Sequence, residues 1–319
     1  MRGLTIQAGE VLYQENLPAP VPKPGEVRVQ VRLAGVCATD LALARGYMDF
    51  RGVPGHEFVG EALEGPLKGR RVVGEINAAC GKCDACRADL GRHCPHRDVL
   101  GILGRSGAFA EVLCLPQENL VEVPDDVTDE QAVFAEPLAA AFEIVEQVDV
   151  LSAERALVVG DGRLGLLCAQ VLGLAKLPVT LVGRHPERGD WLGGTVRHAG
   201  GLEAVGEERF GLVVEATGSP DVFVEALART APRGTLVLKT TSERPVTIDL
   251  APLVVDEISV IGSRCGRFLP AVEALASGAI ETAPMIHARY PLASGPEAFR
   301  RAGQRGTLKV LLDPLDQPT

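Results

Sequence analysis

The sequence predicts an α/β chain of two domains, a β-rich one followed by one built around a parallel sheet. With 319 residues, 46% of them hydrophobic, the chain is long and apolar enough for two packed cores. Prolines and glycines interrupt its first part, up to about residue 135, and no long helical period is visible there. After Pro137, short apolar runs alternate with segments of helical period, which is typical of strand–helix–strand units.

The first part is predicted to be a β-rich unit of barrel type. Its clearest strand covers residues 26–36, where apolar side chains alternate with polar ones at the period of a half-buried strand. The apolar members are Val27, Val29, Val31 and Leu33.

The second part is predicted to contain five parallel strands that form a Rossmann-type sheet. These strands are expected at residues 155–159, 179–182, 211–216, 235–239 and 258–261. A tail follows, with helices expected at 268–277 and 296–301 and strands at 286–290 and 308–312. We expect this tail to pack on the first domain.

Composition excludes several classes of function. A net charge of -10 does not suit a protein whose main task is binding a phosphate backbone, so no nucleic-acid partner is expected. The N-terminus lacks the apolar stretch of a secretory signal, and no uncharged apolar run approaches the roughly 18 residues that cross a bilayer. We therefore expect a cytoplasmic protein without a membrane partner.

Four cysteines with short spacers indicate a structural zinc site, because zinc favours four soft ligands in a tetrahedron. They are Cys80, Cys83, Cys86 and Cys94. Accidental clustering and a redox role for one Cys-x-x-Cys pair are the alternatives. A closed site of four thiolates leaves no open coordination position, so it is expected to brace a loop. The other cysteines are interpreted as small buried hydrophobes: Cys114, Cys168 and Cys265.

Three separated segments carry a second set of metal ligands. Each segment taken alone is more typical of a core residue or a turn, but together they supply the three ligands that a catalytic zinc needs. They are Cys37 with Thr39 and Asp40, His56 with Glu57, and Glu136 before Pro137.

A glycine-rich turn follows the first strand of the second part and opens a helical run over 166–174. This context indicates a dinucleotide site, because glycines allow close backbone approach and the helix N-terminus offers free N–H groups to phosphates. A purely structural turn is the alternative. The residues expected to bind cofactor there are Gly160, Gly162, Arg163, Leu164 and Gly165.

The second strand of this sheet ends without the acidic residue that NAD sites place about 20 positions on to hold ribose hydroxyls. Basic side chains follow this strand instead, and their positive charge suits the extra phosphate of NADP. We therefore expect NADP to be preferred over NAD. The expected residues are Gly183, Arg184, His185 and Arg188. Two alternatives stay open. Glu187 could be the ribose-binding acid at a shifted position, or the arginines could simply lie on a solvated loop. Thr217 and Gly218, after the third strand, are expected near the nicotinamide half.

These segments, in this order and along nearly the whole chain, resemble the zinc-containing medium-chain dehydrogenase/reductase family, the alcohol and polyol dehydrogenases. The resemblance implies a GroES-like catalytic domain over residues 1–137, which carries the four-cysteine loop. It implies a Rossmann cofactor domain over 138–265 and a C-terminal segment, 266–319, that returns to the catalytic domain. The implied activity is hydride transfer between NADP(H) or NAD(H) and a small alcohol, polyol or sugar, or the corresponding carbonyl, with two zinc ions per chain.

The resemblance also implies roles for single residues. Cys37 and His56 would bind the catalytic zinc, Thr39 would accept the proton of the substrate hydroxyl, and Asp40 would orient the ligands. The third ligand is either Glu57 or Glu136, and polyol-type members typically carry a glutamate at the position of Glu136. Many members continue the proton relay with a histidine where this chain has Ala42, so the relay is expected to end differently, through water or the cofactor ribose.

Two rival interpretations of the sequence exist. A non-catalytic, NADP-binding regulatory protein with one structural zinc finds support in Ala42 alone. A zinc-free quinone or enoyl reductase conflicts with both sets of metal ligands. Members of the family commonly pair subunits through the last strands of the cofactor domain, here residues 255–262, so a homodimer or homotetramer is expected.

Overall fold

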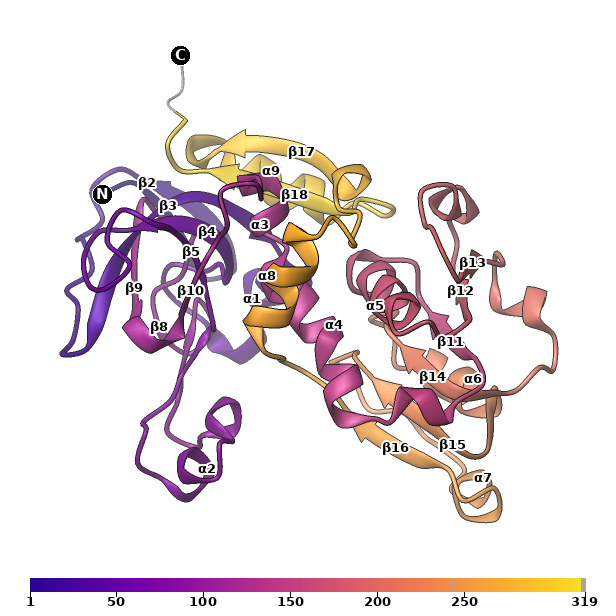
Figure 1. The fold of residues 1–319 in the computed structure, drawn as a ribbon. Helices are drawn as coiled ribbons and strands as arrows, with labels where there is room; N and C mark the ends of the chain where they lie inside the picture. The colour runs from indigo at the N-terminus through magenta and orange to yellow at the C-terminus, as the bar shows by residue number, and fades with distance from the viewer. Residues whose placement is uncertain (242–243, 317–319) are drawn as a thin grey trace. The chain divides into compact units, whose positions relative to one another are not determined.

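The computed structural model describes residues 1–241 and 244–316, which form two compact units. The first unit comprises Met1–Glu136, Phe268–Ser277 and the chain from Thr282 onward, and the second comprises Pro137–Arg267 and Gly278–Glu281. Figure 1 shows the course of the chain. Among the described residues no helix has the length and apolar character needed to span a membrane.

The sequence analysis expected everything from residue 266 to return to the first unit, but Gly266, Arg267 and the short segment Gly278–Glu281 belong to the second. Two hydrogen bonds explain the placement of Gly278–Glu281. Gln170 Nε2 donates to the carbonyl of Glu281 at 3.1 Å, and the Glu281 N–H donates to Gln170 Oε1 at 2.7 Å.

The main sheet of the first unit is built around the long strand β3, Glu26–Val36, at the position that the alternating pattern predicted. Its strand order is β10-β5-β4-β3-β18-β17, and β9 also pairs with β3. The strands are β4 (Glu57–Ala62), β5 (Arg71–Gly74), β9 (Val112–Pro116), β10 (Leu120–Glu122), β17 (Ile286–Pro291) and β18 (Lys309–Asp313). Strand β18 pairs antiparallel with β3, so the C-terminal tail completes this sheet.

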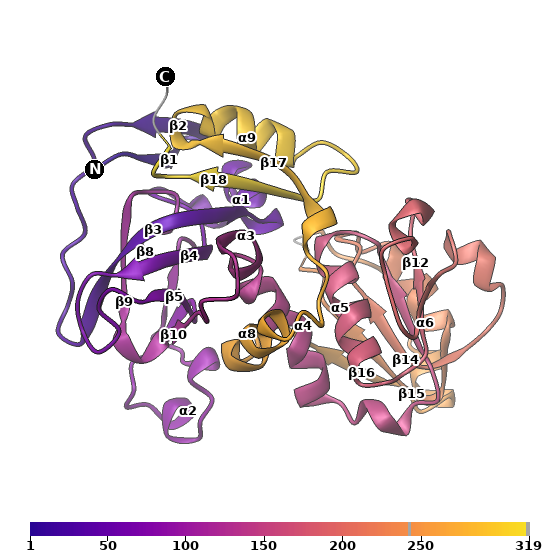
Figure 2. The same ribbon diagram turned by 45° about the horizontal axis from the view of Figure 1, so that its top comes forward.

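Smaller elements surround that sheet. Two short sheets are formed by β1 (Gly3–Gln7) with β2 (Glu10–Gln14), and by β6 (Asn77–Ala78), β7 (Asp98–Leu100) and β8 (Gly104–Arg105). The helices are α1 (Ala38–Ala44), α2 (Asp84–Arg87), α3 (Asp129–Ala132), α8 (Phe268–Ala276) and α9 (Gly295–Ala302), and α4 (Ala135–Gln147) begins here. Helix α9 packs against β2, β17 and β18, as Figure 2 shows.

The second unit is a parallel sheet with the strand order β13-β12-β11-β14-β15-β16. Its strands are β11 (Ala156–Val159), β12 (Val179–Val182), β13 (Val196–His198), β14 (Phe210–Glu215), β15 (Thr230–Leu238) and β16 (Ser259–Gly262). Helix α5 (Arg163–Leu174) contacts β11 to β14, α6 (Val222–Ala228) contacts β14 and β15, and α7 (Ala251–Val255) precedes β16. Leu157, Phe210 and Leu236 belong to its buried core.

The five predicted strands are all present, and β13 is a further strand that the sequence analysis missed. It is only three residues long and carries Arg197 and His198, so neither an apolar run nor a clear alternation marks it. Strand β13 pairs with β12 at the edge of the sheet.

A buried ion pair joins β4 to β18 across β3. Lys309 Nζ donates to Glu57 Oε2, and the two side chains are 1% and 2% exposed. The ammonium group also lies 5.4 Å from the centre of the Phe134 ring. Gly35, on the intervening strand, leaves room for the pair, because a Cβ there would lie 2.4 Å from Glu57 Oε2 and 3.1 Å from Lys309 Cδ.

Removing one partner of this pair should destabilise the first unit strongly. The change Lys309→Met leaves the Glu57 carboxylate buried without its cation, which costs about 3–5 kcal/mol in the free energy of unfolding. Urea denaturation followed by circular dichroism measures this, and adding Glu57→Gln should restore most of the loss. As a control, Arg70→Met breaks a pair with Glu122 whose side chains are 53% and 40% exposed, and should cost less than about 1 kcal/mol. Equal losses in the two variants would contradict the burial argument.

Candidate metal and dinucleotide sites

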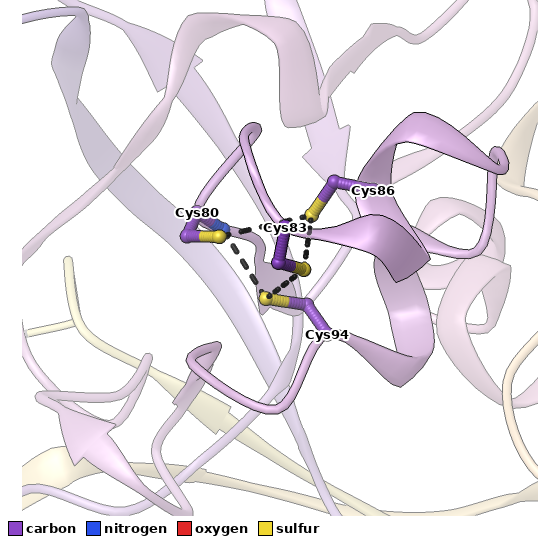
Figure 3. Close-up of side chains that lie close together, drawn as sticks. All are labelled: Cys80, Cys83, Cys86 and Cys94. Carbon is purple, nitrogen blue, oxygen red and sulfur yellow. Dashed lines mark hydrogen bonds between the residues drawn. The ribbon is translucent and has the colours of Figure 1, made fainter.

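The four predicted zinc ligands lie together on the loop around α2, in the first unit. The sulfur atoms of Cys80, Cys83, Cys86 and Cys94 all lie within 4.8 Å of one another (Figure 3). Three of the separations are 3.4 Å between Cys83 and Cys86, 3.7 Å between Cys83 and Cys94, and 3.9 Å between Cys80 and Cys86. Four sulfurs about 2.3 Å from a central zinc would lie about 3.8 Å apart, so the donors fit this ion.

Backbone N–H groups around the loop favour thiolates. The N–H groups of Lys82 and Cys83 lower the pKa of the Cys80 thiol to about 6. The Cys94 sulfur accepts from the N–H of Cys80 at 3.5 Å and from that of His96 at 3.3 Å. No cysteine of the chain forms a disulfide, and all eight lie within the described residues.

A second cluster forms where β3 leads into α1. Cys37 precedes the first helical residue, and Asp40, in the first turn, accepts a hydrogen bond from the Cys37 N–H at 2.8 Å. The other oxygen of Asp40 accepts from the Gly55 N–H at 3.2 Å and lies 3.4 Å from His56 Nδ1. Asp40 is fully buried, and it joins two loops that are distant in the sequence.

The His56 ring is turned toward this carboxylate. The 3.4 Å separation is an ion-pair distance, and Nδ1 has no hydrogen bond of good geometry. Burial lowers the pKa of His56, but the negative charges of Asp40 and Cys37 outweigh burial and raise this pKa well above its usual value. The negative charges beside His56 suit a metal cation.

Glu136, in the first turn of α4, belongs to the same electrostatic environment. Loss of solvation and the charge of the neighbouring Glu57 raise the pKa of its carboxyl, His56 and Lys309 lower it, and the net effect is a pKa raised to about 7. Thr39 lies beside the cluster, where its Oγ1 accepts a long contact of 3.9 Å from the Cys37 sulfur.

The structure does not bring all the predicted ligands to one point. In the ranges 1–241 and 244–316, the ligand atoms of Cys37, His56, Glu57 and Glu136 form no group within 4.8 Å of one another. Glu57 instead pairs with Lys309, a residue that the sequence analysis missed. A lone lysine within the apolar run Leu308–Leu312 is the signal that could have found it, because a lysine is rarely buried without a partner.

The glycine-rich turn leaves β11 and opens α5, as predicted. Gly160 has φ +112°, and a Cβ on it would lie 2.7 Å from the carbonyl oxygen of Ala216. Gly165 packs so tightly on this turn that a Cβ would lie 1.8 Å from the Gly160 oxygen. Gly162 precedes the helix and faces open space, since nothing lies within 4 Å of its Cβ position. The backbone is tightly packed at Gly160 and Gly165 and open at the start of the helix, which fits a diphosphate. Arg163 and Leu164 form the first turn of the helix.

The predicted phosphate-binding cations divide into two kinds. Arg184 is exposed and follows β12, whereas Arg188 is buried and its Nη1 donates to the backbone oxygen of Asp161 at 2.5 Å. The same nitrogen lies 3.8 Å from Asp161 Oδ1. The structure therefore corrects the solvated-loop alternative for Arg188 and gives this arginine a partner within the protein.

Thr217 and Gly218 lie after β14, next to the glycine-rich turn. The Thr217 hydroxyl donates to Glu215 Oε1 at 2.5 Å, and the Gly218 N–H donates to Thr240 Oγ1 at 2.8 Å. A Cβ on Gly160 would lie 3.0 Å from the backbone nitrogen of Thr217, so the two turns meet at the carboxyl edge of the sheet.

Comparison with known proteins agrees with this architecture. Residues 23–125 match the alcohol dehydrogenase GroES-like domain family, and residues 130–313 match the glucose dehydrogenase C-terminus family. L-threonine 3-dehydrogenase of Sinorhizobium medicae is 38% identical over 197 residues, a match that covers 56% of this chain and 56% of that relative.

Two crystal structures resemble nearly the whole chain. RspB of Escherichia coli CFT073, described as a short chain alcohol dehydrogenase and complexed with NADH, is 27% identical with a TM-score of 0.90, over 98% of this chain and 99% of that one. A zinc-binding dehydrogenase of Sinorhizobium meliloti, bound to NADP, is 26% identical with a TM-score of 0.87 over the same shares. With its GroES-like and glucose dehydrogenase C-terminal regions, this chain belongs to the zinc-containing medium-chain dehydrogenase/reductase family.

Proposed function

We propose that this protein is a zinc-dependent dehydrogenase that transfers a hydride between a nicotinamide dinucleotide and a small alcohol, polyol or sugar, or the corresponding carbonyl. The observation that carries the proposal is the cluster of the half-buried Cys37 with the buried Asp40 and His56, with Glu136 in the same electrostatic environment. When bound, zinc supplies Lewis-acid polarisation of the substrate oxygen, and the nicotinamide accepts or returns the hydride.

Cys37 and His56 are the proposed zinc ligands, and Asp40 is the residue that positions both. Its carboxylate holds the Cys37 backbone through one oxygen and faces His56 Nδ1 with the other, which leaves Nε2 as the ring nitrogen directed to a metal. A carboxylate on the far nitrogen of a zinc-binding histidine fixes the ring and raises its basicity. Thr39 then accepts the proton of the substrate hydroxyl at its Oγ1, and Ala42 passes no proton on, so water or a ribose hydroxyl continues the relay.

Glu136 is the proposed third ligand, in preference to Glu57. The Glu57 carboxylate is held by Lys309 in a buried pair, so moving it to a metal would leave that ammonium group unpaired. The carboxyl group of Glu136 has a pKa raised to about 7, and a nearby dication would stabilise its ionised form.

A second, structural zinc is proposed for Cys80, Cys83, Cys86 and Cys94, whose sulfur separations fit a closed tetrahedral site. This gives two zinc ions per chain. The dinucleotide is proposed to bind at Gly160, Gly162 and Gly165, where the N-terminus of α5 faces open space. The sequence analysis expected NADP because of nearby cations, of which Arg184 is exposed whereas Arg188 already lies beside Asp161.

Zinc content and turnover test the two metal sites together. Wild-type protein purified without chelators should hold two zinc ions per chain by mass spectrometry. Cys37→Ser should lose one ion and its turnover of NADH or NADPH with small alcohols and carbonyls, because a catalytic ligand is gone. Cys83→Ser should lose the other ion.

Cys114→Ser is the matched control and should keep both ions, because burial raises the pKa of this thiol to about 11 and keeps it neutral. A single ion that only Cys83→Ser removes would contradict the catalytic site. It would favour a non-catalytic, dinucleotide-binding protein with one structural zinc.

We also propose that the protein is a homodimer or homotetramer that pairs through β16. This strand lies at the edge of its sheet, and an edge strand offers unpaired N–H and C=O groups to another copy. Large apolar side chains are exposed next to it: Val254 is 76%, Val255 78% and Val260 39% exposed.

Analytical ultracentrifugation tests this assembly. The double change Val255→Asp with Val260→Asp should shift wild-type dimers or tetramers toward a smaller species, because charges would face charges across the twofold axis. Val21→Asp, at a position that is 85% exposed in the first unit, should leave the mass unchanged. A wild-type monomer would refute the proposal.

A further inference from the structure

The turn after β12 contains a carboxylate that comes from another part of the chain. The side chain of Asp161, between the glycines of the glycine-rich turn, reaches the end of β12 and lies over Gly183. A Cβ on Gly183 would lie 2.1 Å from Asp161 Cγ and 2.4 Å from each of its carboxylate oxygens. The Asp161 carboxylate therefore fills the space that a side chain at position 183 would take, and the acid missing from position 183 is present in space.

Three groups hold this carboxylate in place. The His185 N–H donates to Asp161 Oδ2 at 2.6 Å, and His198 Nε2 lies 3.3 Å from the same oxygen. His198 Nδ1 accepts from the Gly200 N–H at 3.0 Å, so Nε2 carries the proton and donates to Asp161. Arg188 binds the Asp161 backbone oxygen and lies 3.8 Å from Oδ1.

The surroundings keep this acid ionised. Burial alone would raise the pKa of Asp161, but the His185 N–H, His198 and Arg188 outweigh burial and lower this pKa below its usual value. The side chain is 8% exposed, so its negative charge is screened little by water. Of the predicted phosphate-binding cations, Arg188 already faces this charge.

We infer that Asp161 selects NAD(H) over NADP(H), by taking the place of the acid that dinucleotide sites usually carry at the end of the second strand. This inference rests on the proposed dehydrogenase function and states which of the two dinucleotides that enzyme would use. An acid at this position favours ribose hydroxyls and repels a 2′-phosphate. The acid comes from the glycine-rich turn, which precedes β12 in the chain, and therefore does not appear at the position where the sequence pattern places it.

The test is to measure dissociation constants of NADH and NADPH, by fluorescence titration or calorimetry, on full-length protein. Wild type should bind NADH at least about tenfold more tightly than NADPH, the size of effect expected from repulsion of one carboxylate and a phosphate at short range. Asp161→Asn keeps the shape and removes the charge, and should reduce this preference by about tenfold. Thermal melts verify that each variant is folded.

Two further variants sharpen the result. Asp161→Ala with Gly183→Asp moves the acid to the usual position and should restore the preference for NADH. Glu187→Gln is the matched control, because this acid is on the same turn and 67% exposed, and should change the ratio of the two constants by less than about twofold. If Asp161→Asn does not fold, the ratio of the NADH and NADPH dissociation constants can still be measured on wild type and on Asp161→Ala with Gly183→Asp, and these two ratios test the inference.

The outcomes separate this inference from the proposed function. Tighter binding of NADPH by wild type, an unchanged ratio in folded Asp161→Asn, or loss of the preference in Glu187→Gln would overturn the role of Asp161 and leave the dehydrogenase intact. Wild-type protein that binds neither dinucleotide would overturn the proposed function itself, and the inference with it.

Discussion

The buried carboxylate of Asp40 is the interaction on which the proposed active site depends. A charged group without solvent has to be paired, and Asp40 meets this need with the N–H groups of Cys37 and Gly55 and the ring of His56. These partners come from two loops that the sequence separates. The same contacts that stabilise the carboxylate therefore also set the positions of the two proposed zinc ligands, Cys37 and His56.

Glu57 and Lys309 are a second case in which buried charged groups are paired, beside this cluster. The pair connects β4 to the last strand of the chain, so the C-terminal tail supplies a charge to the neighbourhood of the site. Its effect on the proposed chemistry is indirect, since the pairing of Glu57 with Lys309 is the reason why Glu136 is proposed as the third zinc ligand. In the second unit Asp161 similarly occupies Arg188, a cation that would otherwise be free to bind a phosphate.

Local patterns were sufficient to predict most of the fold, the four-cysteine cluster and the glycine-rich turn. The alternation over 26–36, the apolar runs of the parallel sheet and the Gly160–Gly165 turn all depend on neighbours in the sequence, so composition and period reveal them. The four-cysteine loop is equally local, because short spacers alone bring its sulfurs together. Strand β13 was missed because three residues are too few for a period.

What could not be predicted depends on contacts between distant segments. The Glu57–Lys309 pair joins residues 252 positions apart, and the Asp161 carboxylate reaches a strand that begins well after it. The sequence pattern places the ribose-binding acid at the end of β12, whereas the fold can bring an acid to the same place from the glycine-rich turn. The choice between Glu57 and Glu136 was open for the same reason.

Anomalous diffraction at the zinc absorption edge, from crystals grown without chelators, locates the metal ions in this protein. We expect two peaks per chain, one among the four cysteine sulfurs and one between Cys37, His56 and Glu136, with Glu57 still paired with Lys309. A single peak at the four cysteines, or a second peak bound by Glu57 in place of Glu136, would contradict this expectation.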